Sequence, residues 1–180
     1  MPVMTTRGLS PVFSRLLAAP LSGAMALAAP VSAQQGVITS FDAPAFAAAV
    51  NAVGGKPGQA TVENGKSYYT LTLPSGIPAI AYFDDCQGQV CKSLVLLASL
   101  APPPQRTVAE IDEMLRTVNN NVPSAKVFRI NDRVVMQHYV LADFGIAAQN
   151  LQEHIKMFSN VTVSMYQTLN PQAAQPASGG

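Results

Sequence analysis

The chain has 180 residues, of which 48% are hydrophobic and 12% are charged, and its formal net charge is +1. A chain of this length buries roughly 70% of the surface that its unfolded state exposes, which excludes a wholly disordered protein and favours a single domain. Aromatic residues make up 7%, and the sequence contains no block rich in lysine or arginine. The charge pattern of a nucleic-acid-binding protein is therefore missing, and we expect no nucleic-acid partner.

The N-terminal segment has the pattern of a secretory signal peptide. Arg7 and Arg15 precede an uncharged stretch, residues 16–30, that is rich in Leu, Ala and Met. Small residues follow at the usual spacing, and we predict cleavage after Ala33. A membrane-spanning or amphipathic first helix is the alternative, but the stretch is shorter than the ~20 residues that a bilayer crossing requires. We expect the mature chain in the periplasm or secreted, with no membrane insertion once the leader is removed.

The first element predicted after the leader is a short helix. Asp42 can cap the first free amides, Pro44 is tolerated in the first turn, and Phe41 can pack onto Phe46. The two glycines at 54–55 are expected to end this helix.

Strand patterns follow. Residues 59–63 and 66–73 flank an Asn-Gly pair at 64–65, whose residues accept the positive φ angles of a tight hairpin turn. Residues 77–83 form a third candidate strand. Pro78 should lie at its start or on an edge, because proline cannot donate a ladder hydrogen bond.

A central strand and a second helix are predicted next. Residues 90–100 are nearly all apolar, which favours a strand that is buried on both faces. Thr107 and Glu110 have the spacing of a capping box at a helix start, and the asparagines at 119–121 with Pro123 end that helix. Its apolar face, which we expect against the sheet, consists of Val108, Ile111, Leu115 and Val118.

A second hairpin and a long helix complete the pattern. Residues 126–130 and 133–141 are strand-like and flank Asn131 and Asp132. One face of the later strand consists of Val134, Met136, His138 and Val140. The apolar stripe of the closing helix consists of Leu151, Ile155, Phe158, Val161, Met165 and Leu169.

These elements predict an α+β fold with an antiparallel sheet. Their order is a helix, three to four strands, a helix, a two-stranded hairpin and a long C-terminal helix. We expect one domain over residues 34–169, followed by a disordered tail at 170–180.

Cys86 and Cys91 are the two cysteines of the chain, and they flank the turn between two predicted strands. In an exported chain we expect a disulfide between them. So short a ring stabilises by about 2 kcal/mol at most, which tightens a hairpin rather than holding the fold. Redox catalysis and zinc binding are the alternatives. Redox sites use Cys-x-x-Cys at a helix start, and zinc needs two more ligands at a spacing that His138 and His154 do not provide.

Few other residues suggest chemistry. For His138 and His154 we expect partly buried rings with one hydrogen bond each, and a role in catalysis or ligand contact is the alternative. Asp84 and Asp85 are adjacent and point to opposite faces of a strand, which favours solvated turn acids over an acid–base pair. The sequence has no nucleophile elbow, zinc-protease helix, phosphate loop or dinucleotide fingerprint. We therefore expect no catalytic residue, no metal and no cofactor.

The order of the elements, together with the segment at 85–94, resembles the YbjN domain family, whose members are provisionally assigned as bacterial sensory transduction regulators. In that segment Asp-Cys, four residues and Cys-Lys-Ser-Leu follow one another. The resemblance covers about residues 41–169. The family commonly carries Trp-Asn at the end of its second helix, where this chain has Val118 and Asn119. The resemblance implies an α+β fold similar to that of type III secretion chaperones, a non-enzymatic role and a capacity to form homodimers.

Two functional hypotheses follow from these observations. The first is an exported, non-enzymatic protein-interaction or regulatory domain with an unidentified protein partner. The second is a periplasmic small-ligand-binding protein or hydrolase with a site near His138, suggested by Tyr68, Tyr82 and Tyr139 on predicted strands. A concave pocket that joins His138 to a carboxylate or hydroxyl would favour the second, and one contiguous exposed apolar patch would favour the first.

Overall fold

The structure is a computed structural model that describes residues 36–63 and 66–171. The predicted leader with its cleavage position at Ala33, the turn at 64–65 and residues 172–180 of the predicted tail lie outside the described residues. In chain order the elements are β1 (Val37–Ile38), α1 (Ala43–Ala52), β2 (Lys56–Glu63), β3 (Lys66–Thr72), β4 (Pro78–Gln87), β5 (Val90–Leu100), α2 (Val108–Asn121), β6 (Lys126–Ile130), β7 (Arg133–Leu141), β8 (Ile146–Ala147) and α3 (Ala148–Leu169).

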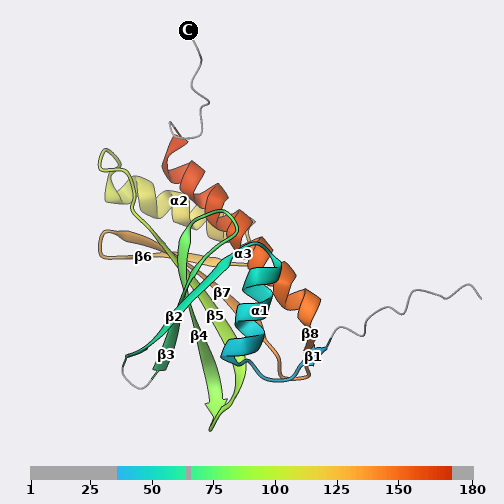
Figure 1. Cartoon of the computed structure of the whole chain (residues 1–180). Helices are drawn as coiled ribbons and strands as arrows, with labels where there is room; N and C mark the ends of the chain where they lie inside the picture. The colour runs from blue at the N-terminus through green and yellow to red at the C-terminus, as the bar shows by residue number, and fades with distance from the viewer. Residues whose placement is uncertain (1–35, 64–65, 172–180) are drawn as a thin grey trace, which may run out of the picture. The chain divides into compact units, whose positions relative to one another are not determined.

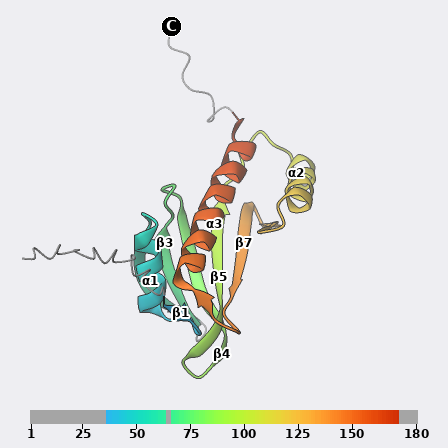
Figure 2. The ribbon, with the colours of Figure 1, turned by 90° about the vertical axis from the view of Figure 1, so that its right-hand side faces the viewer.

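Six strands form one antiparallel sheet in the order β2-β3-β4-β5-β7-β6 (Figure 1). Helices α1 and α3 pack against each other, and α3 also contacts β5 and β7. Figure 2 shows α3 running diagonally across the sheet, with α1 beside it. The predicted α+β class, with an antiparallel sheet and a long C-terminal helix, is confirmed.

Helix α1 begins and ends where the sequence predicts. The carboxylate of Asp42 accepts a hydrogen bond of 2.7 Å from the backbone N–H three residues later, which caps the helix. Gly54, with a φ of 82°, follows the C-terminal end. Phe41 and Phe46, which we expected to pack on each other, both pack against the ring of Phe83. Their ring centroids lie 6.4 and 6.1 Å from that of Phe83.

Strand β5 lies in the middle of the sheet, as its apolar sequence predicts. Val95 and Leu96 point to opposite faces and expose only 1% and 0% of their surface. Two strands are longer than the sequence indicates, since β2 begins at Lys56 and β4 continues to Gln87. The added end of β4 is polar, so it has no apolar alternation. Asp84, Cys86 and Gln87 pair with β5, while Asp85 between them has a positive φ of 49°. Pro78 is the first residue of β4, where its missing donor is tolerated.

Helix α2 begins with the predicted capping box. The hydroxyl of Thr107 accepts from the N–H of Glu110 at 3.3 Å, and the Glu110 carboxylate accepts from the N–H of Thr107 at 2.7 Å. Ile111 and Leu115 are buried as expected. The expectation for Val108 is wrong, because its side chain is 55% exposed. The helix packs mainly on β6, an edge strand, and this leaves its first turn uncovered.

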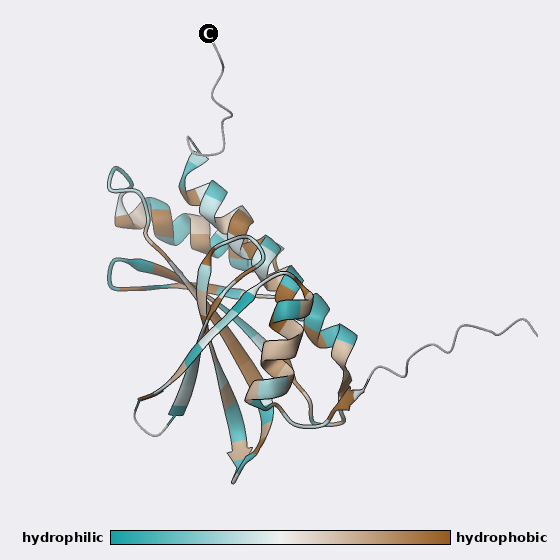
Figure 3. Ribbon diagram, in the orientation of Figure 1, coloured by the Kyte–Doolittle hydropathy of each residue, from teal (hydrophilic) through white to brown (hydrophobic). Residues whose placement is uncertain are grey.

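Strands β6 and β7 have the predicted bounds, and Asn131 provides the positive φ of 52° in the turn between them. The predicted apolar positions of α3 are buried, apart from the partly buried Val161. Hydrophobic and hydrophilic residues alternate in bands along α2 and α3 (Figure 3). None of the helices in the described ranges is long and apolar enough to cross a bilayer.

The ribbon of β1 and β8 was not predicted from the sequence. Val37 and Ile38 pair with Ala147 and Ile146, and the N–H of Ala148 donates to a backbone carbonyl next to β1 at 3.0 Å. Each strand has only two residues, which is too short for a period-two pattern to be recognised.

Candidate binding surface

In the described part of the chain, α1 and α3 cover one face of the six-stranded sheet, which we call the inner face. Successive side chains of a strand point to opposite faces of the sheet. The residues that alternate with those of the inner face therefore point away from α1 and α3, and we call this side of the sheet the outer face. Direct pairing between strands places outer-face side chains in rows. One row consists of Tyr68, Tyr82, Val95 and Tyr139, and the next consists of Thr70, Ile80, Leu97 and Gln137.

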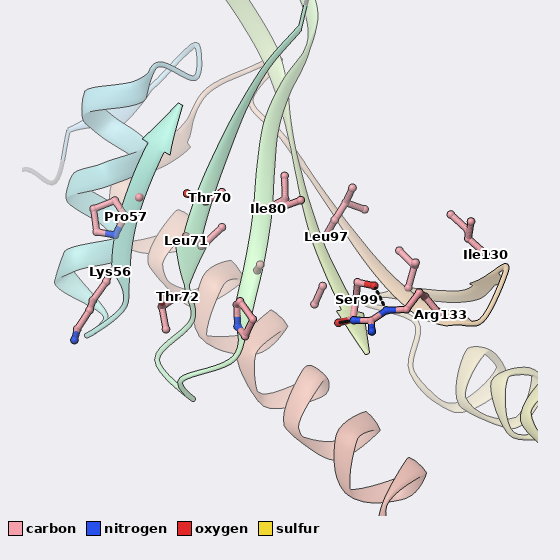
Figure 4. Close-up of a pocket in the computed structure, with 15 residues that line it drawn as sticks. Lys56, Pro57, Thr70, Leu71, Thr72, Ile80, Leu97, Ser99, Ile130 and Arg133 are labelled. Atoms are coloured by element: carbon pink, nitrogen blue, oxygen red, sulfur yellow. Dashed lines mark hydrogen bonds between the residues drawn. The ribbon is translucent and has the colours of Figure 1, made fainter. Parts of the chain in front are cut away.

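The outer face is hollowed between β2 and the hairpin of β6 and β7. A cavity of about 630 Å³ lies there. Figure 4 shows Lys56 at one side of it, Ile80 and Leu97 in its middle, and Ile130 and Arg133 at the other side. Ile80 is 42% exposed and Ile130 is 51% exposed, so apolar side chains in this region are open to solvent. This cavity has the size and apolar lining of a ligand pocket.

Arg133 is held in one orientation at the wall of this cavity. Its Nε donates to Oγ of Ser99 at 3.0 Å, and its Nη2 donates to the backbone carbonyl of Ser99 at 2.9 Å (Figure 4). Ser99 lies on β5 and pairs with Val135, the outer-face neighbour of Arg133 along β7. A guanidinium carries five N–H donors, so two bonds to Ser99 leave others available to a bound group.

A second polar group lies near the far end of the outer face. Lys66 donates to Asp84 at 3.2 Å, and its ammonium lies 5.4 Å from the ring centroid of Tyr82. The hydrogen bond to Asp84 raises the pKa of Lys66 above its ordinary value. Burial, followed by the charge of Asp84, raises the pKa of Tyr82. At neutral pH Lys66 is therefore an ammonium and the Tyr82 hydroxyl keeps its proton.

His138 lies on the inner face and is 5% exposed. Its Nδ1 contacts the carbonyl of Ser124, which can only accept, so Nδ1 carries the proton and Nε2 accepts from Nδ1 of His154 at 2.9 Å. Burial lowers the pKa of His138, an effect that the Ser124 carbonyl opposes and the charge of His154 reinforces. Burial also lowers the pKa of His154. The pair is neutral near pH 7 and joins β7 to α3 and to the loop before β6.

The structure does not bring together the residues that suggested a hydrolase. Tyr139 and His138 are consecutive residues of β7, so their side chains point to opposite faces. Tyr68 and Tyr82 share the outer face with Tyr139, and their ring centroids are 5.5 Å apart. The hydroxyl of Tyr139 donates to Ser93 at 2.8 Å. His138 instead has two ring contacts, with Ser124 and His154, where one hydrogen bond was expected.

Cys86 and Cys91 form the disulfide that their spacing predicts. They are directly paired residues of β4 and β5, and the S–S distance is 2.14 Å. The backbone carbonyl of Cys91 accepts from the N–H of Phe41 at 2.8 Å. The disulfide therefore closes the hairpin beside the segment that leads into α1.

The sequence pattern did not predict the outer-face cavity. Its wall residues Lys56 and Arg133 are far apart in the chain, and the strand order brings both to one side of the sheet. Part of the cavity floor could have been predicted from the sequence. The alternation in β7 places Val135 on the face opposite to Val134 and Met136, and the pairing of β5 with β7 places Leu97 on that same face. Among the described residues, no three His, Cys, Asp or Glu side chains lie together so that they could hold a metal ion.

Comparisons with known proteins add a similarity of fold. No protein-family model matches the sequence, and no curated protein matches it. Solved structures do match, and one is the crystal structure of YbjN from E. coli, a protein provisionally assigned as a transcription regulator. It has a TM-score of 0.48 and 12% sequence identity, and the match covers 73% of this chain and 96% of that chain. With so low a sequence identity, the similarity to YbjN concerns the arrangement of helices and strands alone and says nothing about an activity, a ligand or a partner of this chain.

Proposed function

We propose that the protein acts after export as a non-enzymatic protein-interaction or regulatory domain, and that the outer face of its sheet is the contact surface. The observation that carries this proposal is the apolar outer face, which α1 and α3 leave uncovered. Ile80, Ile130 and Leu141 are each 42% to 51% exposed there. Exposed apolar side chains along an uncovered sheet face are typical of a protein contact.

Two features support the proposed location outside the cytosol. The leader pattern at residues 1–33 favours secretion. The disulfide between Cys86 and Cys91 is of a kind that persists in oxidising compartments. A domain of this type needs no membrane anchor of its own to meet a periplasmic partner.

The alternative of a hydrolase near His138 has less support. Both ring nitrogens of His138 are already engaged, by Ser124 and His154, and the tyrosine hydroxyls lie on the other face. A general base must reach a proton of its substrate within hydrogen-bond distance. A buried ring with both nitrogens occupied does not offer that contact.

A photocrosslinking amino acid at position 80 tests the interaction. The full-length chain is expressed in the cells that naturally produce it, with the crosslinker in place of Ile80 in one version and of Val108 in another. Both side chains are exposed, at 42% and 55%, but only Ile80 is on the outer face. We expect a discrete crosslinked protein from position 80 that position 108 does not give.

A second change makes the result specific. Adding Val135→Asp to the position-80 version places a charge in the middle of the apolar surface, and we expect it to abolish the product. Identical products from positions 80 and 108, or no product from position 80, would show that the outer face is not a protein contact. Mass spectrometry of the same material tests export, with Gln34 expected at the mature N-terminus.

A further inference from the structure

The outer-face cavity combines an apolar floor with walls that come from opposite edges of the sheet. The floor contains side chains of Ile80, Leu97 and Val135, which lie on three successive strands β4, β5 and β7. The wall on the β2 side contains Gly58, where an added Cβ would lie 2.3 Å from Oγ1 of Thr70. The β2 backbone therefore packs directly on β3 at this wall, and a residue with a side chain would push the wall away.

Charge in this cavity has one sign. Its lining contains Lys56 on the β2 side and Arg133 on the β7 side, and all its other lining residues are uncharged. Arg133 is oriented by its two hydrogen bonds to Ser99, so its remaining donors are pre-positioned. A fixed guanidinium beside an apolar floor favours a carboxylate, which it can bind with two parallel hydrogen bonds.

The hydrogen-bonding state of the sheet limits what can lie in the cavity. The floor residues Ile80, Leu97 and Val135 are each paired with residues of both neighbouring strands, whereas β4 and β5 no longer pair beyond Ile80 and Leu97. The backbone beneath the floor side chains therefore lies within the sheet pairing. An extended peptide laid across these side chains would find no backbone partners on the floor, and unpaired peptide groups are costly to bury. An alkyl chain has no such groups to satisfy.

We propose that this cavity binds a single-chain amphipathic carboxylate, with the alkyl chain on Ile80, Leu97 and Val135 and the carboxylate on Arg133. The volume of about 630 Å³ lies within the range of small-molecule sites. This site is separate from the histidine pair, which lies on the inner face. Binding of a free amphiphile does not depend on the proposed protein contact, because it is measured with the purified protein alone.

Titration of the isotope-labelled mature protein with decanoate, below its micelle concentration, tests the proposal by nuclear magnetic resonance. Decylammonium has the same chain with the opposite charge, and acetate has the same head group without a chain. We expect saturable shifts of the amides of Ile80, Leu97 and Val135 with decanoate. Decylammonium should bind at least about tenfold more weakly, and acetate should give no saturable shift at these amides.

Two pairs of variants separate the charge from the apolar floor. Arg133→Gln should weaken decanoate binding about tenfold, while Arg116→Gln, an exposed arginine paired with Glu113 on α2, should not change it. Ile80→Ser should weaken binding, while Val62→Ser, which removes a 73% exposed side chain outside the cavity lining, should not. Amide spectra of each variant show directly whether it is folded.

Three results would overturn the proposal. They are equal affinity for decanoate and decylammonium, equal loss of affinity in the two arginine variants, and the absence of saturable shifts at the outer-face amides. A failure here leaves the crosslinking result at position 80 unaffected, since that experiment measures a protein contact. A crosslinked partner with no decanoate binding would assign the cavity to the protein contact instead.

Discussion

The two faces of the six-stranded sheet are made by the same strands and have opposite surroundings. On the inner face, Leu96 and Met136 are fully buried beneath the helices. On the outer face, the adjacent residues Leu97 and Val135 line an open cavity. A shift of one residue along a strand therefore changes a core position into a position that lines the cavity. The outer face of β5 therefore contains both a buried position, Val95, and a partly exposed one, Leu97, so apolar sequence in a central strand does not by itself mean that every position is buried.

The largest expected effect comes from testing this difference at two neighbouring leucines. Leu96→Ala removes a side chain with 0% exposure and should lower the free energy of unfolding by about 2–5 kcal/mol, since it leaves a cavity in the core. Leu97→Ala removes the same atoms from a partly exposed position and should lower it by about 1 kcal/mol. Urea denaturation of both variants measures the two values. Equal losses would mean that the outer face is part of the core.

The next effect concerns the β4–β5 tip. Replacing both cysteines with serine, Cys86→Ser and Cys91→Ser, should lower the free energy of unfolding by about 2 kcal/mol, because the short loop is no longer closed in the unfolded chain. Wild-type protein kept in a reducing agent is the control and should unfold at the same denaturant concentration as the double variant. A loss large enough to unfold the protein at room temperature would show that the disulfide holds the fold.

A smaller effect is expected at the edge of the sheet. The side chain of Asn119 on α2 accepts from the N–H of Val127 at 2.8 Å and donates to its carbonyl at 2.7 Å, as a neighbouring strand would. Asn119→Ala leaves both groups of this edge strand unpaired and should lower the free energy of unfolding by about 1–2 kcal/mol. Asn120→Ala, the adjacent exposed residue, is the control. Because alanine has a higher helix propensity than asparagine, Asn120→Ala should not lower the stability, and equal losses in the two variants would show that the contact with Val127 is not the cause.

Local chemistry determined which parts of this fold could be predicted from the sequence. The capping box at Thr107 and the alternation in β7 were predicted correctly, because a few adjacent residues fix each of them. The β1–β8 ribbon depends on pairing between distant segments, which the sequence pattern does not show. The polar end of β4 pairs with the neighbouring strand β5, but its residues have no apolar alternation that would predict a strand. The exposure of Val108 has the same origin, since it depends on where the sheet ends.

The candidate site was harder to predict than the fold. Tyr68, Tyr82 and Tyr139 were recognised as residues of interest, and the structure does place them on one face. The walls of the cavity beside them contain Arg133 and Lys56, which lie on opposite sides of it and share one face only through the order of six strands. Sequence alternation assigns a residue to one of two faces, but it does not say which face the helices cover.

The two faces of the sheet also differ in how they change the pKa values of their ionisable side chains. The outer-face ammonium of Lys66 is exposed beside Asp84, whereas the inner-face ring of His138 is buried and contacts His154 from α3. Burial holds the pKa of His138 below its ordinary value, while in the unfolded chain it is about 6.5. The unfolded state therefore takes up a proton first as the pH falls. The stability of the neutral pair is complete above about pH 6.5 and decreases as the pH falls towards the folded pKa.

This small effect can be isolated by comparing how steeply the free energy of unfolding changes with pH in the wild type and in two histidine variants. His138→Gln keeps a donor for the Ser124 carbonyl but cannot titrate, so the variant should be less stable than the wild type at about pH 7.5 and should lose less on going to about pH 5. His154→Gln removes the partner ring and leaves His138 buried, so a pH-dependent loss should persist in it. Urea midpoints at several pH values measure both slopes. A slope in His138→Gln equal to that of the wild type would show that groups other than His138 cause the acid sensitivity.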